Sequence, residues 1–254
     1  MNSLSVVIIT FNEEYNIERC LNSVKTLADE IIILDSFSTD STIKIAHKMG
    51  AIVKQQKFIS YIDQKNSALK LAKNNYVLCL DADEALDDIL INSICEAKND
   101  FTFSAYKSNR CTSFCGHFIR YGSWYPDKKI RLFDKRFAKW GGLNPHDKIE
   151  LTGQDKRVKY LKGDILHYSF SSIQEQLIRN EVYSTISAAS LFEIGIESNW
   201  YKIVINPLWT FFFGYVIRFG FLDGYYGFII ALNSARATLQ KYMKLYRLQN
   251  GSVK

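Results

Sequence analysis

The sequence lacks the glycine-rich motifs of the commonest nucleotide-binding loops. It contains neither Gly-x-Gly-x-x-Gly nor a phosphate-binding loop that ends in Lys-Ser or Lys-Thr. These absences argue against dinucleotide oxidoreductases and P-loop ATPases. The sequence also has no internal repeat and no low-complexity linker, so a solenoid or a chain of tethered modules is not expected.

The amino terminus and the cysteines carry no sign of export. The first five residues include no basic stretch ahead of an apolar one, which argues against a secretory signal. The odd cysteine count predicts reduced thiols and a cytoplasmic protein; the residues are Cys20, Cys79, Cys95, Cys111 and Cys115. Cys111, Cys115 and His117 fit no standard zinc spacing and lack an evident fourth ligand, so they are predicted to be core or loop residues.

The aromatic and basic C-terminal segment, residues 200–248, has no 18-residue window free of both charge and proline. Pro207, Arg218 and Asp223 interrupt it, which argues against a membrane-spanning helix. Aromatic rings combined with Lys and Arg favour a helix that lies at a membrane surface. A helical hairpin packed on the rest of the protein is the alternative.

The length and composition predict a chain that folds around a hydrophobic core, and its charge is compatible with an anionic partner. The 254 residues are 47% hydrophobic and 14% aromatic, enough to bury a core. The formal charge of +6 is only mildly basic. It suits an anionic sugar nucleotide or an anionic membrane surface, and we expect no nucleic-acid partner.

The most informative stretch is an apolar run, residues 77–80, that ends in three acids. Such an unbroken run is typical of a strand buried on both faces, and Asp81, Asp83 and Glu84 follow it directly. Asp81 and Asp83 are two positions apart, so in an extended chain they project to one side. Paired carboxylates of this kind can hold a divalent cation whose other ligands are waters and substrate phosphates. The alternative is that Asp83 caps a helix over residues 84–97.

The first hundred residues alternate between apolar runs and helical patterns. Strands are predicted at 5–9, 31–34, 51–54 and 77–80, with helices at 17–26, 41–49 and 63–73. This order predicts a doubly wound, mostly parallel α/β sheet. Polar clusters follow three of the strands, at Asn12-Glu13, Asp35 and Asp81-Asp83. Because open α/β sheets bind ligands at the carboxyl ends of their strands, we expect these clusters to form one site.

After residue 100 the pattern changes. Strands are predicted at 101–110, 129–133 and 161–168, and a long helix at 171–195 with Glu175 placed for a capping box. Residues 138–147 are predicted to be irregular, because Gly141, Gly142 and Pro145 disfavour regular structure.

With these motifs in view, the chain resembles the family 2 glycosyltransferases, which are inverting enzymes of the GT-A fold. The likeness rests first on residues 6–14, 35–40 and 80–84. It is closest to the branch of bacterial lipopolysaccharide core glucosyltransferases, which shares segments seen here as Trp124-Tyr-Pro-Asp127, Arg131-Leu-Phe133, His167-Tyr-Ser169 and Gly220-Phe-Leu-Asp-Gly224. The resemblance implies metal-dependent transfer of a hexose, for example glucose, from a UDP-sugar to a cell-envelope glycan or glycolipid such as lipopolysaccharide core. It also implies three regions: a nucleotide-sugar-binding half (1–100), an acceptor-binding and catalytic half (101–199) and a helical segment (200–254).

The resemblance also implies a donor site. Its nucleotide-sugar-binding residues would be Thr10, Asn12, Glu13, Asp35, Lys65, Asn66, Asp81, Ala82 and Asp83. Asp35 would bind the uracil ring, Lys65 and Asn66 would lie near the diphosphate, and Asp81 would contact the ribose. Asp83 would bind Mg²⁺ or Mn²⁺. His167 would complete the metal sphere or be a core histidine with a satisfied hydrogen bond.

The implied catalytic base is Asp147 of the His146-Asp147 pair. The related branch usually has His-Glu at this place, so the carboxylate here is one methylene shorter; Glu150 and Asp127 are reserve candidates. The implied acceptor-binding residues are Trp124, Tyr125, Arg131 and His146. Because of the Asp147 departure, a non-catalytic protein that binds a sugar nucleotide or glycan is the alternative. A sugar-phosphate nucleotidyltransferase ranks lower, because residues 10–13 lack its glycine-rich loop.

Overall fold

The structure is a computed structural model that describes residues 2–143 and 146–251. The chain forms two compact units, each built from two separate segments. Unit 1 comprises residues 1–110 and 127–167, and unit 2 comprises residues 111–126 and 168–254. The three functional regions expected from the sequence stay a prediction.

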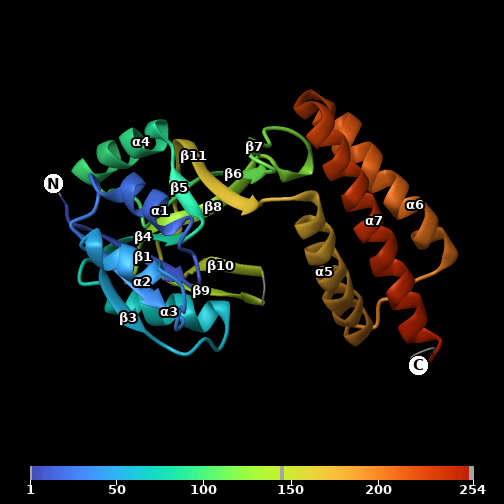
Figure 1. The fold of residues 1–254 in the computed structure, drawn as a ribbon, viewed down its shortest axis with the longest axis horizontal. Coiled ribbons are helices and arrows are strands. Elements are labelled where there is room, and N and C mark those ends of the chain that lie inside the picture. The colour runs from blue at the N-terminus through green and yellow to red at the C-terminus, as the bar shows by residue number, and fades with distance from the viewer. Residues whose placement is uncertain (1, 144–145, 252–254) are drawn as a thin grey trace. The chain divides into compact units, whose positions relative to one another are not determined.

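Unit 1 contains a mixed sheet whose parallel part holds the N-terminal strands (Figure 1). The parallel strands are β1 (Leu4–Thr10), β2 (Glu30–Asp35), β3 (Ile52–Gln55) and β4 (Tyr76–Asp81). The remaining strands on the path are β5 (Glu84–Leu86), β6 (Ala105–Phe114), β8 (Asp127–Asp134) and β11 (Val158–Phe170). The order is β3-β2-β1-β4-β8-β6-β11-β5, with β7 (His117–Phe118) beside β6. The predicted α/β class and the predicted parallel start of the sheet are confirmed.

Helices cover both faces of the parallel strands because alternate strand residues point to opposite sides. The helices are α1 (Ile17–Val24), α2 (Thr42–Lys48), α3 (Tyr61–Leu71) and α4 (Asp88–Asn99). Val6, Ile8 and Leu80 share one core with α1, α2 and α4. Val7 and Cys79 face the other way and share a second core with α3 and with Trp140. Thus α3 and the segment around Trp140 cover the same face.

Two local expectations are wrong. Residues 84–86 form the short strand β5 instead of the start of a helix, and the cap of α4 is Asp87, whose side chain accepts a hydrogen bond from the Leu90 amide at 2.7 Å. Strands β9 (Ala138–Leu143) and β10 (His146–Leu151) pair as an antiparallel hairpin, although the glycines predicted irregular structure. The glycines fit it: Gly142 has φ +97°, and a side chain at Gly141 would collide with Glu150.

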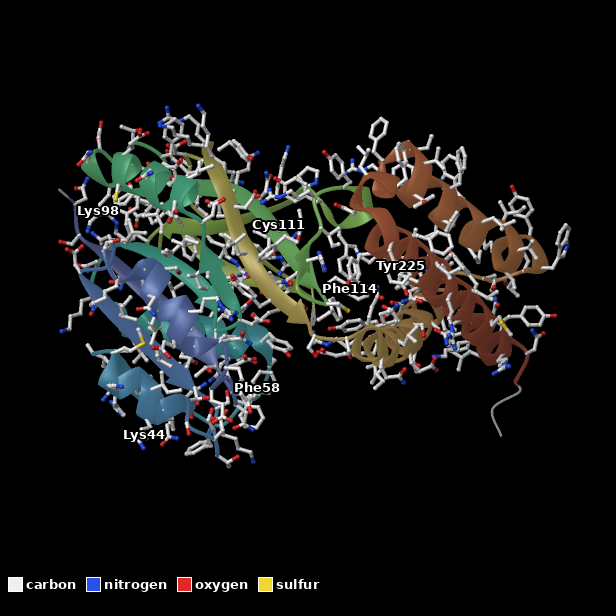
Figure 2. The ribbon with its side chains drawn as sticks, turned by 45° about the horizontal axis from the view of Figure 1, so that its top comes forward. Lys44, Phe58, Lys98, Cys111, Phe114 and Tyr225 are labelled. Atoms are coloured by element: carbon white, nitrogen blue, oxygen red, sulfur yellow. The ribbon has the colours of Figure 1, made fainter. Side chains whose placement is uncertain are left out.

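Unit 2 consists mainly of helices. They are η1 (Gly122–Trp124), α5 (Ile173–Glu193), α6 (Trp200–Phe212), η2 (Phe213–Ile217), η3 (Gly220–Asp223) and α7 (Gly224–Gln249). The predicted cap of α5 is confirmed: Ser172 accepts from the Glu175 amide, and the Glu175 carboxylate accepts from the Ser171 amide. Phe114, labelled in Figure 2, is fully buried in a small aromatic core of this unit.

Among the described residues no single helix has the length and apolar character needed to cross a membrane. The segments Trp200–Ile217 and Gly220–Gln249 meet that criterion only as a pair, and they are bent by 73° at the break between them.

Candidate active site at the sheet edge

The strand register brings the predicted polar strand ends together. Thr10 at the end of β1 pairs with Asp35 at the end of β2, and Ile9 pairs with Asp81 at the end of β4. Parallel strands end at one edge of a sheet, so the residues that follow them form a single cluster. The convergence predicted from the sequence is therefore observed, while the role of each residue in binding stays a prediction.

Asp81 lies between two buried cations. Its carboxylate is 3.0 Å from Nζ of Lys65 and 3.0 Å from Nη2 of Arg131. Burial alone would raise the pKa of Asp81, but Lys65 and Arg131 outweigh it and hold that pKa well below its usual range. Asp81 is therefore a carboxylate at any physiological pH, able to accept hydrogen bonds and unable to donate one.

Lys65 connects this carboxylate to the predicted base. Its Nζ lies 2.8 Å from Oδ2 of Asp147, which is carried on β10 of the hairpin. The Lys65 side chain is 7% exposed and that of Asp147 is 14% exposed, so the ion pair is largely shielded from water. Two residues that are 82 positions apart in the chain are thus joined beside Asp81.

Trp140 is a part of the site whose contacts differ from the sequence expectation, which was that its ring could stack on a sugar or contact an anionic group. It is 3% exposed, and its ring lies 4.5 Å from Nζ of Lys65 and 5.3 Å from the guanidinium carbon of Arg131. Both cations therefore rest against its π face. Asn66 exchanges two hydrogen bonds with the Trp140 backbone, at 2.9 and 3.1 Å. The residue predicted to lie near the diphosphate thus fastens the hairpin to α3.

Glu84 and Arg131 form a buried ion pair beneath Asp81. Glu84 is fully buried, accepts a hydrogen bond from the Asp81 amide at 3.1 Å and lies 2.7 Å from Nη2 of Arg131. Burial would lower the pKa of Arg131, but Glu84 and Asp81 raise it above its ordinary value. Arg131 was predicted to bind the acceptor, yet it is only 5% exposed and engaged with two carboxylates. The structure thus gives it a supporting position under Asp81.

Asp83 and His167 meet at the same edge. Nε2 of His167 lies 3.2 Å from Oδ2 of Asp83, and the pairing of β11 with β5 aligns His167 with Glu84. Within the described parts of the chain, no cluster of three or more His, Cys, Asp or Glu side chains is suited to a metal. The Asp83 carboxylate nonetheless fits a Mg²⁺ or Mn²⁺ ion that takes its remaining ligands from phosphate oxygens and water, and the His167 imidazole suits the transition metal Mn²⁺ better than Mg²⁺.

The loops after β1 and β2 are tied to each other. Asp35 is fully buried and accepts hydrogen bonds from the Ser38 amide (2.9 Å), the Ser38 hydroxyl and Gln55 (3.2 Å). Asn12 has φ +52° and accepts from the Thr39 amide at 2.8 Å. The Asp35 carboxylate, predicted to bind uracil, is thus engaged in holding its own loop.

Thr10 and Glu13 complete the predicted base and ribose pocket. Thr10 is 5% exposed, and its hydroxyl has no hydrogen-bond partner among the described residues. The Glu13 carboxylate accepts from the Asn16 side chain at 2.8 Å, and the Glu13 amide donates to Thr42 at 2.8 Å. Ala82 is 3% exposed and contributes to the core between the two aspartates.

The two cysteines near the cluster are poor nucleophiles. Burial raises the pKa of the Cys79 thiol to about 12. Burial, reinforced by Glu84, Asp83 and Asp81, raises the pKa of the Cys20 thiol well above its ordinary value. Neither is a thiolate near neutral pH, so chemistry at this edge rests on carboxylates and on the histidine.

The remaining predicted acceptor residues are not tested. Trp124 and Tyr125 belong to unit 2, where the Trp124 ring stacks on Phe170 at 5.3 Å and the Tyr125 carbonyl accepts from Arg218 at 3.0 Å. His146 begins β10, but its side chain lies outside the described part of the structure. Their contacts with an acceptor stay predictions.

Comparisons with known proteins agree with this arrangement. Glycosyl transferase family 2 matches residues 5–150. An uncharacterized glycosyltransferase of Rickettsia typhi is 31% identical over 100% of this chain and 89% of its own length. The lipopolysaccharide core biosynthesis glycosyltransferase LpsC of Rhizobium meliloti is 27% identical over 96% of this chain and 92% of its own.

Among solved structures, glucosyl-3-phosphoglycerate synthase from Mycobacterium tuberculosis, in complex with Mn²⁺ and UDP, is 25% identical with a TM-score of 0.37. That match covers 42% of this chain and 43% of the other. The family match spans more than half of the chain, including the carboxyl ends of β1, β2 and β4, and the observed sheet is the one that the GT-A assignment predicted. The chain belongs to glycosyltransferase family 2.

Proposed function

We propose that this glycosyltransferase is a metal-dependent, inverting enzyme that moves a hexose from a UDP-sugar to a cell-envelope glycan or glycolipid. Lipopolysaccharide core is the acceptor class that the relationship to LpsC favours. Glucose is the first donor sugar to test. The observation that carries the proposal is the Asp81–Lys65–Asp147 chain of ion pairs, because it puts a candidate base beside the carboxylate predicted to hold the ribose.

The charges of the cluster favour a metal cofactor. Four carboxylates (Asp81, Asp83, Glu84 and Asp147) face three ion-paired cations (Lys65, Arg131 and Arg110), so the carboxylates are in excess by one. An anionic diphosphate would be repelled from such a cluster unless a cation came with it. Asp83 and His167 would hold the ion, which when bound supplies positive charge to the leaving diphosphate.

Asp147 would accept the proton of the acceptor hydroxyl. Inversion requires a base on the side of the sugar opposite the leaving group, and a carboxylate can fill that role. Lys65 holds Asp147 at a fixed point at the edge of the donor site and takes no proton from the acceptor itself. The buried ring of Trp140 keeps both Lys65 and Arg131 in place.

The test is UDP release from UDP-glucose and other UDP-hexoses with Mn²⁺ and a lipopolysaccharide-core acceptor. Asp147→Asn should lower kcat about 100-fold or more while UDP binding is kept. Asp83→Asn should weaken both metal dependence and UDP binding. Asp155→Asn, in an exposed ion pair with Arg157, is the matched control and should behave as wild type.

Turnover unchanged by both Asp147→Asn and Asp83→Asn would refute the proposed mechanism. UDP binding that requires Mn²⁺, with no product from any acceptor, would favour the alternative of a non-catalytic sugar-nucleotide or glycan binding protein. We further propose that the enzyme works in the cytoplasm, on the inner face of the membrane where such acceptors are built.

A further inference from the structure

The segment from α6 to α7, residues 200–249, exposes many large apolar side chains. Trp200 is 74% exposed, Leu208 63% and Tyr225 64%. Tyr225 is labelled on α7 in Figure 2. A contiguous apolar surface is unusual on a soluble monomer and marks a place where another apolar body docks.

On α6 these side chains form a stripe. Tyr201, Val204, Leu208 and Phe212 are spaced by three or four positions, so they lie along one side of the helix. They are 54%, 49%, 63% and 45% exposed, respectively. The stripe therefore faces away from the partner helix, and nothing among the described residues covers it.

The charge of the same segment indicates what covers it. Its basic residues are Lys202, Arg218, Arg236, Lys241, Lys244 and Arg247, and its sole acid is Asp223. Lys244 is ion-paired with Glu181 of α5 at 2.6 Å, and Arg218 donates to the Tyr125 carbonyl at 3.0 Å, so the other four carry the argument. Asp223 accepts hydrogen bonds from the amides of Arg120 and Tyr121, at 3.2 and 2.9 Å, so it has a local structural task. A second copy of this chain would bring the same positive charge to the surface, and the two copies would repel each other. Anionic lipid headgroups beside acyl chains match both the charge and the apolar stripe.

We propose that residues 200–249 bind the surface of an anionic lipid bilayer, with the stripe of Tyr201, Val204, Leu208 and Phe212 inserted at the level of the headgroups. Exposed Trp and Tyr rings favour that depth, because their apolar rings and polar tips match the two sides of the interface. This inference does not depend on the transfer reaction, since it concerns binding alone.

The test is co-sedimentation of the full chain with two kinds of vesicle. One is pure phosphatidylcholine and the other contains about one third phosphatidylglycerol, a mixture chosen to carry a negative surface potential. The wild type should bind the anionic vesicles at least about tenfold more tightly, and raising the salt should weaken that binding. Leu208→Glu should weaken it about tenfold or more, because a charge replaces the most exposed side chain of the stripe.

Ile89→Glu on α4 is the matched control, since Ile89 is 60% exposed and lies in unit 1. It should bind as wild type does. Circular dichroism of both variants should match the wild type, so a loss of binding is not a loss of fold. The inference is overturned if anionic vesicles do not bind the wild type, or if Leu208→Glu and Ile89→Glu bind equally. It is also overturned if Leu208→Glu only converts a dimer to a monomer.

Discussion

Replacing Lys65 by methionine should destabilise the protein more than any exposed-charge substitution. Lys65 is the link between two carboxylates, Asp81 at 3.0 Å and Asp147 at 2.8 Å, and its side chain is 7% exposed. Methionine keeps the length and the apolar stem against Trp140 but removes the charge. Both carboxylates then stay in the site without the cation that stabilised them.

The magnitude follows from burial. Removing one partner of a buried ion pair costs about 3–5 kcal/mol, because the other charge is left uncompensated. Here Asp81 keeps Arg131 at 3.0 Å, and its side chain is 25% exposed, so the lower end applies. We expect Lys65→Met to lower the free energy of unfolding by about 3 kcal/mol.

A double-mutant cycle separates the ion pair from packing. The variants are Lys65→Met, Asp147→Asn and the two together, measured by urea unfolding with tryptophan fluorescence. The double variant should lose less stability than the sum of the single ones, by about 1–2 kcal/mol. The same cycle on the exposed pair Asp155 and Arg157 should give no measurable coupling. A coupling energy between Lys65 and Asp147 below about 0.5 kcal/mol would refute the reasoning, because the stability effects of two independent substitutions add to within about that amount.

The pH dependence of the free energy of unfolding is a second measurement on the same variants. The pKa of Asp81 is depressed in the folded state by Lys65 and Arg131, against the effect of burial. Its ionised form therefore stabilises the protein above the unfolded-state pKa of about 3.9, and that contribution is lost as the pH falls through the lower, folded-state pKa. The stability difference between wild type and Lys65→Met should narrow as the pH falls below about 4.

Two further variants and one chemical probe test the packing of the residues around the site. Gly163→Ala should cost more than about 2 kcal/mol, because Gly163 has φ +96° and a Cβ there would lie 2.2 Å from the Leu90 nitrogen; thermal unfolding measures it. Asn66→Ala should cost about 1–3 kcal/mol through its two lost bonds to the Trp140 backbone, with faster amide hydrogen exchange in the hairpin; unchanged exchange would contradict this. Cys79 should resist iodoacetamide at pH 8 until the protein unfolds, since its thiol pKa is about 12, and rapid alkylation of the native protein would disprove its burial.

The sequence predicts well what depends on local pattern. The apolar runs of β1, β2 and β4 identify both the strands and the edge where they end, because burial on two faces requires unbroken apolar residues. The β9–β10 hairpin was missed because its glycines argue locally for a loop, whereas pairing and the burial of Trp140 make it regular. The roles of Trp140 and Glu84 were missed for a related reason. Their partners, Asn66 and Arg131, are 74 and 47 positions away, and no local pattern encodes such contacts.

The position of Asp147 is set by contacts between its hairpin and helix α3. Consecutive residues on a helix point in directions about 100° apart, so Lys65 and Asn66 reach different strands of the hairpin. Lys65 contacts Asp147 on β10, and Asn66 bonds to Trp140 on β9. Since α3 packs against β1 and β2 as well as against β9, the hairpin is aligned with the strands that carry Thr10 and Asp35. In the register, Asp147 lies opposite Gly142, whose φ of +97° shapes the hairpin backbone there. The backbone therefore brings the shorter aspartate within 2.8 Å of Lys65, and the role of Asp147 as the base stays a prediction.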